Sequence, residues 1–295
     1  MSFNREASRQ DRDRRAHEVQ MEVSGLDQYE KLNTEVANQL IEAGRGHDVA
    51  RNLEKFEGLD HADIANRLLE SGQGMALVFN LTKFEGLDHI DIASRLFDKG
   101  EAESIAINIR KFNDLSVEFL NKLVDAGHGA EIAKNLYGLK EVDHIDLANR
   151  LLDTEQIDAF IKEFRNFKGM DAGIALRLME AGKASFVAKE LRHFKDLNNE
   201  VANKFIDEDL TEVIEDYPES FEGIKQETVY RIIERGITIV LLDSIQKIPG
   251  LDHSAIVNKI IDEGEQLSME EVEEFFTNVN QATLDRLEER NRSLM

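Results

Sequence analysis

One segment that recurs along the chain decides the fold. Leu59–Gly72 reads LDHADIANRLLESG, Leu87–Gly100 reads LDHIDIASRLFDKG, and Val142–Thr154 reads VDHIDLANRLLDT. Weaker copies extend the series, and their last residues follow one another in steps of 27 or 28: Gly44, Gly72, Gly100, Gly127, Thr154, Gly182, Asp209, Gly236 and Gly264. Nine units this short cannot each bury an apolar face, so they have to stack on one another.

Each unit contains two helical patterns. In the first half, Ile64, Ala65 and Leu68 fall on one stripe of a helix, which we call helix A. The glycine after it supplies the left-handed residue that commonly closes a helix. In the second half, Val49, Ala50 and later apolar residues form a helix B. A phenylalanine recurs near its end and indicates an apolar column in the core: Phe56, Phe84, Phe112, Phe167, Phe194 and Phe221.

The repeat predicts an all-α fold, a right-handed α-solenoid of nine two-helix repeats with a helical C-terminal cap. Residues 1–24 lack the pattern and form an arginine-rich arm, residues 25–266 carry the repeats, and residues 267–295 form the cap. A hydrophobic residue before a Ser-x-x-Glu box at Ser268 marks the start of the cap helix. Pro218 lies inside helix B of unit seven and should break that helix at Tyr217. We expect this break to divide the stack into one block before and one block after residues 207–223.

Charge and composition exclude several classes of protein. Lys and Arg number 36 against 59 Asp and Glu, which gives a formal charge of −23, and the chain has no cysteine. A disulfide framework is therefore excluded. The longest near-apolar run, Ile237–Leu242, is far shorter than the ~18 residues of a membrane-spanning helix. No apolar stretch follows the arginines of residues 1–15, so the sequence predicts a cytoplasmic protein without a secretory signal or a membrane span.

Stacking turns each polar position of the unit into a column. One helix A position is basic in eight units: Arg67, Arg95, Lys122, Arg150, Arg177, Lys204, Arg231 and Lys259. The position three residues later is acidic in all nine: Glu42, Glu70, Asp98, Asp125, Asp153, Glu180, Asp207, Glu234 and Asp262. Carboxylates near a helix C-terminus oppose the helix dipole, so this column needs a tertiary reason. Charge pairs within and between units explain both columns best, and a partner-facing surface is the alternative.

A third column consists of asparagines on helix A: Asn38, Asn66, Asn121, Asn149, Asn203 and Asn258. A parallel set lies on helix B at Asn52, Asn80, Asn108 and Asn135. Asparagine is a poor helix former, so its recurrence also needs a tertiary reason. Its amide can tie adjacent units together or can clamp a peptide backbone. Both roles stay open on the sequence alone.

Four Asp-His pairs recur, and the first is Asp60 with His61. The others are Asp88-His89, Asp143-His144 and Asp252-His253. Each could serve as half of a metal site, but no set converges on the three or four ligands of a transition-metal centre. Aspartates that cap helix N-termini explain the pattern better.

The repeat resembles the α-solenoid class, in which helix pairs stack as in HEAT, armadillo and tetratricopeptide proteins. This resemblance concerns architecture over residues 25–266. The asparagine column is similar to the ladder with which armadillo proteins clamp a peptide backbone. The loop Gly72-Gln73-Gly74, with one varying residue between glycines, looks faintly like the loop of TAL-effector DNA-binding repeats.

The sequence favours a non-catalytic scaffold that binds a protein or an extended peptide along its concave surface. It carries no recognisable catalytic or cofactor-binding signature, and its acidic body favours basic partners. The candidate partner-binding residues are the asparagine column with four arginines: Asn38, Asn66, Asn121, Asn149, Asn203, Asn258, Arg67, Arg95, Arg150 and Arg177. The alternative is a nucleic-acid-binding protein that uses the basic helix A column and the arginine-rich arm, against which the net negative charge argues. The identity of the partner, the oligomeric state and the helix that lines the concave face stay open.

Overall fold

The computed structural model describes residues 26, 29, 31–139, 142–236 and 239–294, and the predicted arm, residues 1–24, lies outside them. The described chain is all-α apart from two very short strands. It divides into two compact units, unit 1 up to Glu131 and unit 2 from Ile132. Among the described residues, no helix combines the length and the apolar character needed to cross a membrane.

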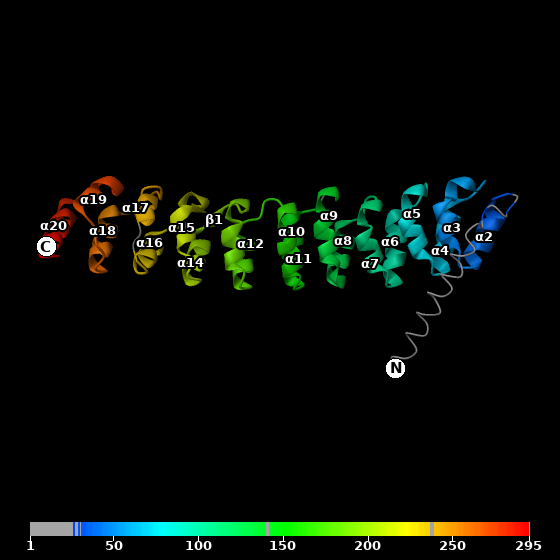
Figure 1. Ribbon diagram of the computed structural model, residues 1–295, viewed down its shortest axis with the longest axis horizontal. Coiled ribbons are helices and arrows are strands. Elements are labelled where there is room, and N and C mark those ends of the chain that lie inside the picture. The colour runs from blue at the N-terminus through cyan, green and yellow to red at the C-terminus, as the bar shows by residue number, and fades with distance from the viewer. Residues whose placement is uncertain (1–25, 27–28, 30, 140–141, 237–238, 295) are drawn as a thin grey trace, which may run out of the picture. The chain divides into compact units, whose positions relative to one another are not determined.

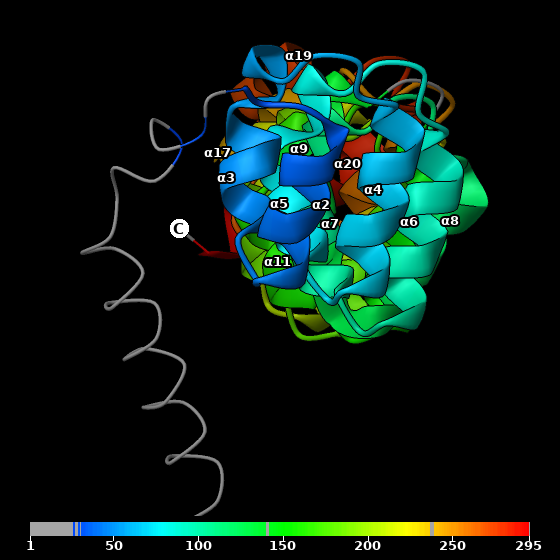
Figure 2. The same ribbon diagram turned by 90° about the vertical axis from the view of Figure 1, so that its right-hand side faces the viewer.

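Unit 1 consists of alternating helices A and B (Figure 1). Its helices A are α2 (Thr34–Glu42), α4 (His61–Glu70), α6 (His89–Asp98) and α8 (Val117–Leu123). Its helices B are α3 (Gly46–Arg51), α5 (Gly74–Asn80) and α7 (Ala102–Ile107), each followed by a 3₁₀ turn: Leu53–Lys55, Leu81–Lys83 and Ile109–Lys111. Contacts between α2 and α4, and from α3 through α5 to α7, show that like helices pack on like. Figure 2 shows the two rows, with α3, α5 and α7 in one and α4, α6 and α8 in the other.

Between α8 and α10 lie a π turn (Val124–His128) and α9 (Gly129–Asn135), which spans the unit boundary. The helices A of unit 2 are α10 (His144–Asp153), α12 (Ala172–Glu180), α14 (Asn199–Asp207), α16 (Gln226–Ile233), α18 (His253–Asp262) and α20 (Gln281–Leu294). Its helices B are α11 (Ile157–Lys162), α13 (Ala184–Lys189), α15 (Glu212–Asp216), α17 (Ile239–Ile245) and α19 (Met269–Phe275). In this unit 3₁₀ turns cover Leu136–Gly138, Phe164–Asn166, Leu191–His193 and Pro218–Ser220.

Within unit 2, each helix A packs on the next from α10 to α20, and α15, α17 and α19 pack in the same way. The described helices therefore stack in chain order within each unit, as a helical repeat requires. The handedness of the superhelix stays a prediction.

Local chemistry sets the ends of helix A. The Asp60 side chain accepts hydrogen bonds from the backbone N–H groups of Ala62 and Asp63, which are otherwise unsatisfied at a helix start. The helix closes at Gly72, whose φ of +73° belongs to the left-handed region. In the fifth repeat the sequence suggested Thr154 as the equivalent residue, and this register was wrong. Thr154 has φ −95°, and the left-handed residue is Glu155 at φ +59°.

The predicted phenylalanine column lies in the core. Six phenylalanines at the end of helix B are at most 8% exposed: Phe56, Phe84, Phe112, Phe167, Phe194 and Phe221. Phe276, after α19, takes the same place in the last repeat and is 6% exposed. Because helix B is short and ends in a 3₁₀ turn, the chain reverses at this residue, and the ring fills the space under the turn.

The segment after each phenylalanine runs alongside the start of a helix A. The strand β1 (Leu197–Asn198) pairs in parallel with β2 (Phe221–Glu222), and isolated bridges join Asn33 to Glu57 and Met170 to Phe194. These contacts satisfy backbone groups that the turn would otherwise leave unpaired. The sequence prediction of an all-helical chain missed them because a two-residue strand leaves no periodic pattern.

Pro218 breaks helix B of the seventh repeat as expected, because α15 ends at Asp216 and Tyr217 has φ −135° and ψ 52°. The predicted division of the stack at this point was wrong. Proline occupies the first position of the 3₁₀ turn, where its missing N–H costs nothing, and other helices B are also interrupted at this place. The helices α14 and α15 pack on α16 and α17, and both lie within unit 2.

The C-terminal segment begins as predicted, with a capping box in which the Ser268 hydroxyl accepts from the Glu271 N–H and the Glu271 carboxylate accepts from the Ser268 N–H. The two helices that follow repeat the packing of the units before them: α19 contacts α17, and α20 contacts α18. The helix α20 is therefore a further helix A, in which Thr283 and Leu287 are buried.

Candidate functional site

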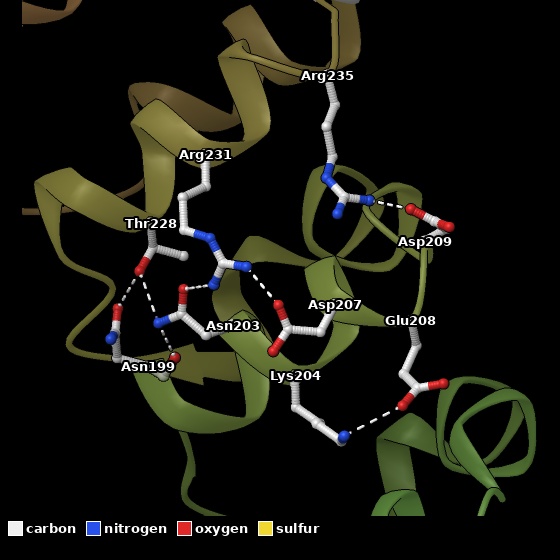
Figure 3. A network of polar contacts seen from close by, with 9 residues as sticks. All are labelled: Asn199, Asn203, Lys204, Asp207, Glu208, Asp209, Thr228, Arg231 and Arg235. Atoms are coloured by element: carbon white, nitrogen blue, oxygen red, sulfur yellow. Dashed lines mark hydrogen bonds and ion pairs between the residues drawn. The ribbon is translucent and has the colours of Figure 1, made fainter.

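The asparagine column of unit 2 lies between consecutive helices A and is occupied by hydrogen bonds (Figure 3). The Arg231 guanidinium, on α16, donates to Asn203 Oδ1 on α14 at 2.5 Å and also to the Asp207 carboxylate on α14. The Asn203 amide donates to Thr228 Oγ1 at 3.0 Å. One asparagine thus receives a charge-assisted bond and returns a neutral one across the same junction.

Two further junctions of unit 2 repeat this arrangement. Arg177 donates to Asn149 Oδ1 at 2.6 Å and pairs with Asp153. Arg286 donates to Asn258 Oδ1 at 2.8 Å and pairs with Asp262, while the Asn258 amide donates to Thr283. We call this set the asparagine–arginine ladder: Asn149, Asp153, Arg177, Asn203, Asp207, Arg231, Asn258, Asp262 and Arg286.

Charge pairs between consecutive helices A account for four of the nine acidic positions, all of them in unit 2. Asp153, Asp207 and Asp262 at the ends of helices A face an arginine of the following helix A, and Glu234 faces Lys259 in the same way. Two carboxylates, Glu234 and Glu263, bond the Lys259 ammonium and raise its pKa above the usual value. The interpretation of these columns as charge pairs between units is confirmed at these junctions.

In unit 1 the same column is less regular. Arg95 donates to Asn66 Oδ1 at 2.5 Å and lies 3.4 Å from its own Asp91. Arg67 pairs with Asp63 of its own helix, and the hydrogen bond that its guanidinium donates to that carboxylate raises the Arg67 pKa. At other junctions the arginine in this position donates to the asparagine of the preceding helix A. Because Arg67 bonds Asp63 instead, Asn38 Oδ1 is buried without a hydrogen-bond partner.

The ten predicted partner-binding residues therefore differ in whether they bond a neighbouring repeat. The structure brings Asn66 together with Arg95 and Asn149 together with Arg177, and it ties Asn203 and Asn258 to arginines outside the predicted set. Asn121 lies half-buried on α8, and Arg150 lies half-buried on α10. In each pair that the structure brings together, the asparagine oxygen holds a neighbouring repeat. The helix B asparagines Asn52, Asn80 and Asn108 instead donate to the carbonyl four residues earlier in their own helix.

Each of the four Asp-His pairs links the start of a helix A to the backbone just after the following phenylalanine. While the aspartate caps helix A, the Nδ1 of His61 accepts the backbone N–H of Glu85 at 2.9 Å, and its ring meets the edge of Phe84. His89, His144 and His253 accept the N–H of Asn113, Lys168 and Thr277 in the same way. An imidazole accepts at Nδ1 only when it is neutral and carries its proton on Nε2. No group of three or more potential metal ligands gathers in the described residues.

This geometry predicts that the protein loses stability in mild acid. Burial lowers the pKa of His144, helped by Lys168 and opposed by Asp143, and burial also lowers the pKa of His253, opposed by Asp252. Because the folded pKa lies below the unfolded one, the unfolded chain binds the proton first. The unfolding free energy therefore falls as pH drops from neutrality through the folded pKa of each histidine. Protonation of His144 or His253 breaks the backbone hydrogen bond that its Nδ1 accepts, and such a bond is worth about 0.5–1.5 kcal/mol.

Urea midpoints between pH 7.5 and 5.5 measure this effect. The chain supplies its own control, because Asn199 in the same register accepts the Lys225 N–H through its side-chain oxygen, and an amide does not titrate. A variant with His144 and His253 both changed to asparagine should have a flatter pH profile. An unchanged slope in that variant would show that other groups cause the acid sensitivity.

A surface that the sequence prediction did not single out lies on helix B. One position immediately after the buried pair of each helix B points outward in eight repeats, and we call it the outer column: Arg51, Phe79, Ile107, Lys134, Lys162, Lys189, Asp216 and Asp243. All eight residues are exposed, while the two residues before them are mostly buried and are apolar in every repeat except at Glu215. In the sequence, this position differs from repeat to repeat while the core positions beside it stay similar. It was not predicted as a site because the sequence prediction considered only positions that keep one residue type.

Comparison of the chain with protein-family models, with curated proteins and with solved structures found no match. The resemblance to helical-repeat proteins is therefore one of architecture, without a named family. Function has to be argued from the surfaces of the chain itself.

Proposed function

We propose that the chain is a non-catalytic interaction protein that binds a partner protein or an extended peptide along the outer column of the helices B within a unit. The observation that carries this proposal is the contrast between constant and varying positions. The core residues and the ladder recur because they hold the repeats together. The outer column is exposed and changes from Arg51 through Phe79 and Ile107 in unit 1 to Lys162, Lys189, Asp216 and Asp243 in unit 2.

Variation at an exposed position has no packing cause, because side chains there fill no cavity. It suits a surface that reads a different residue of the partner at each repeat, as solenoid proteins do with their extended faces. This proposal shifts the binding surface from the asparagine column to helix B. Where the ladder is formed, its asparagines would have to give up an arginine before they could bind a peptide backbone.

Nucleic-acid binding through helix A gains no support from the geometry. Arg67, Arg95 and Arg177 each contact a carboxylate, which lowers the positive potential that phosphates would need. The loop compared with TAL-effector repeats is also engaged, because the Gln73 side chain bonds the Gly46 N–H and the Ile41 carbonyl across the junction.

Affinity capture from an extract of the source cells tests the proposed function. The full chain should enrich specific proteins, and a double variant of the outer column, Lys162→Glu with Lys189→Glu, should lose some of them by at least tenfold. The matched control, Glu70→Lys with Glu180→Lys, changes as many charges at exposed ends of helices A and should retain them. Equal enrichment by both variants, or enrichment no greater than on a blank matrix, would contradict the proposal.

A further inference from the structure

The part of the outer column in unit 1 combines apolar and basic side chains. Phe79 on α5 is 50% exposed and Ile107 on α7 is 59% exposed, and these two helices pack directly on one another. Isolated exposed apolar residues are ordinary, but two at the same register of adjacent helices form a joint surface. No packing role within unit 1 accounts for exposing both.

One lysine is held at the edge of this apolar pair, and a second lysine makes the equivalent backbone contact one repeat earlier. Lys111 Nζ donates to the Phe79 carbonyl at 3.0 Å and lies 5.5 Å from the centre of the Phe79 ring. Lys83 Nζ, one repeat earlier, bonds the Arg51 carbonyl and lies 3.2 Å from Glu54. These contacts use part of the donor capacity of each ammonium, and they fix Lys111 beside Phe79 and Lys83 beside Arg51. Each ammonium has three donors, so an incoming carboxylate still finds one.

The two rows of unit 1 also differ in charge. The helices A α2, α4, α6 and α8 carry seven carboxylates and three basic side chains. The helices B α3, α5 and α7 with their 3₁₀ turns carry three carboxylates and five basic side chains. Although the whole chain has a charge of −23, the helix B row of unit 1 is locally positive. The net charge of the whole chain therefore does not predict the charge of a partner that binds this row.

We infer that the helix B row of unit 1 binds an acidic amphipathic helix, an inference that rests on the proposed function and names the chemistry of the partner. Two apolar residues of that helix cover Phe79 and Ile107, and its Asp and Glu residues meet Lys83, Lys111 and Arg51. Packed helices lie about 8–10 Å apart. Residues i and i+7 of a helix are about 10.5 Å apart on one face, which matches that spacing.

The chemistry favours this partner over nucleic acid. Ile107 has no ring on which a base could stack, and the exposed carboxylates Glu54 and Glu103 in the same row repel phosphates. Carboxylates on a helix can be placed beside Lys111 and Arg51 and away from Glu103, whereas a regular phosphate backbone cannot avoid these acidic side chains. The expected charge of the partner is thus opposite to the basic character inferred from composition.

Fluorescence anisotropy with designed helical peptides tests the inference on the full chain. The probe carries leucines at i and i+7 on a background of alanine and glutamate. One control peptide replaces glutamate by lysine, and another replaces both leucines by alanine. The acidic leucine peptide should bind at least tenfold more tightly than either control, and its affinity should fall as salt is raised.

Protein variants locate the binding surface. Phe79→Ser with Ile107→Ser, and separately Lys83→Glu with Lys111→Glu, should each weaken binding of the probe at least tenfold. Lys162→Glu with Lys189→Glu, in unit 2, should leave it unchanged. Thermal melts of all variants should agree with the parent, because exposed substitutions change stability little.

Several outcomes would overturn the inference. They are equal binding of the alanine control, insensitivity to the Phe79 and Ile107 changes, or stronger binding to duplex DNA or to vesicles of anionic lipid than to the probe. Failure here is distinguishable from failure of the proposed function. If cell-extract partners are lost from the Phe79/Ile107 variant while the probe does not bind, the row binds a partner of other chemistry. If helix B variants lose no extract partner, the proposed function itself is wrong.

Discussion

Changing Phe205 to alanine is expected to lower the unfolding free energy by about 3–5 kcal/mol. Phe205, on α14, is 0% exposed, and its ring meets Phe221 edge-on at a centroid distance of 6.1 Å. The substitution removes a large apolar side chain from the centre of unit 2 and leaves a cavity that neighbouring helices cannot close without breaking the stack. Urea unfolding followed by circular dichroism measures the loss.

Two controls separate burial from residue type. Phe205→Leu keeps most of the volume and should cost less than about 1.5 kcal/mol. Phe79→Ala removes the same ring from a half-exposed position and should change stability by no more than about 0.5 kcal/mol. Because each repeat contacts only its neighbours, amide exchange in the Phe205→Ala variant should accelerate most around α14 and α16. A loss no larger than that of Phe79→Ala would contradict the packing described for α14.

The second large effect is expected from the ladder. Changing Asn149, Asn203 and Asn258 together to alanine should lower the unfolding free energy by about 3–6 kcal/mol. Each loss leaves an arginine without one of its two acceptors, and the cost of an unmade bond to a charged group is about 1–2 kcal/mol at a half-buried site. The three junctions are separated by whole helices, so the losses should add. Thermal and urea unfolding of the triple variant measure the sum.

The asparagines of helix B provide the matched comparison. Asn52, Asn80 and Asn108 bond only a carbonyl of their own helix, so the corresponding triple alanine variant should cost about 1 kcal/mol or less in total. The ladder variant also decides the question left open by the sequence. If it keeps its stability and loses its partners, the asparagines bind a peptide backbone. If it loses stability while the folded fraction still binds, they tie the repeats together.

The repeat unit, its two helices and its core can be predicted from the amino-acid sequence alone. Apolar side chains recur at helical spacing because both faces of every repeat pack against neighbours, so positions such as Ile64, Leu68 and Phe84 are constrained to one type. The capping roles of Asp60 and Ser268 could also be read directly, because a cap depends on residues within one turn.

The pairing of polar groups across the junctions cannot be predicted from the sequence, because it depends on how consecutive helices are rotated against each other. Asn203 and Arg231 are 28 residues apart, and nothing in their own helices shows that the guanidinium reaches back to the preceding repeat rather than to a carboxylate four residues away, as Arg67 does in unit 1. The side-chain partner depends on the rotation between stacked helices, to which the pattern of apolar residues is insensitive. Composition likewise shows only that the chain as a whole is acidic. The separation of charge between the helix A and helix B rows of unit 1 depends on how the helices pack into two rows.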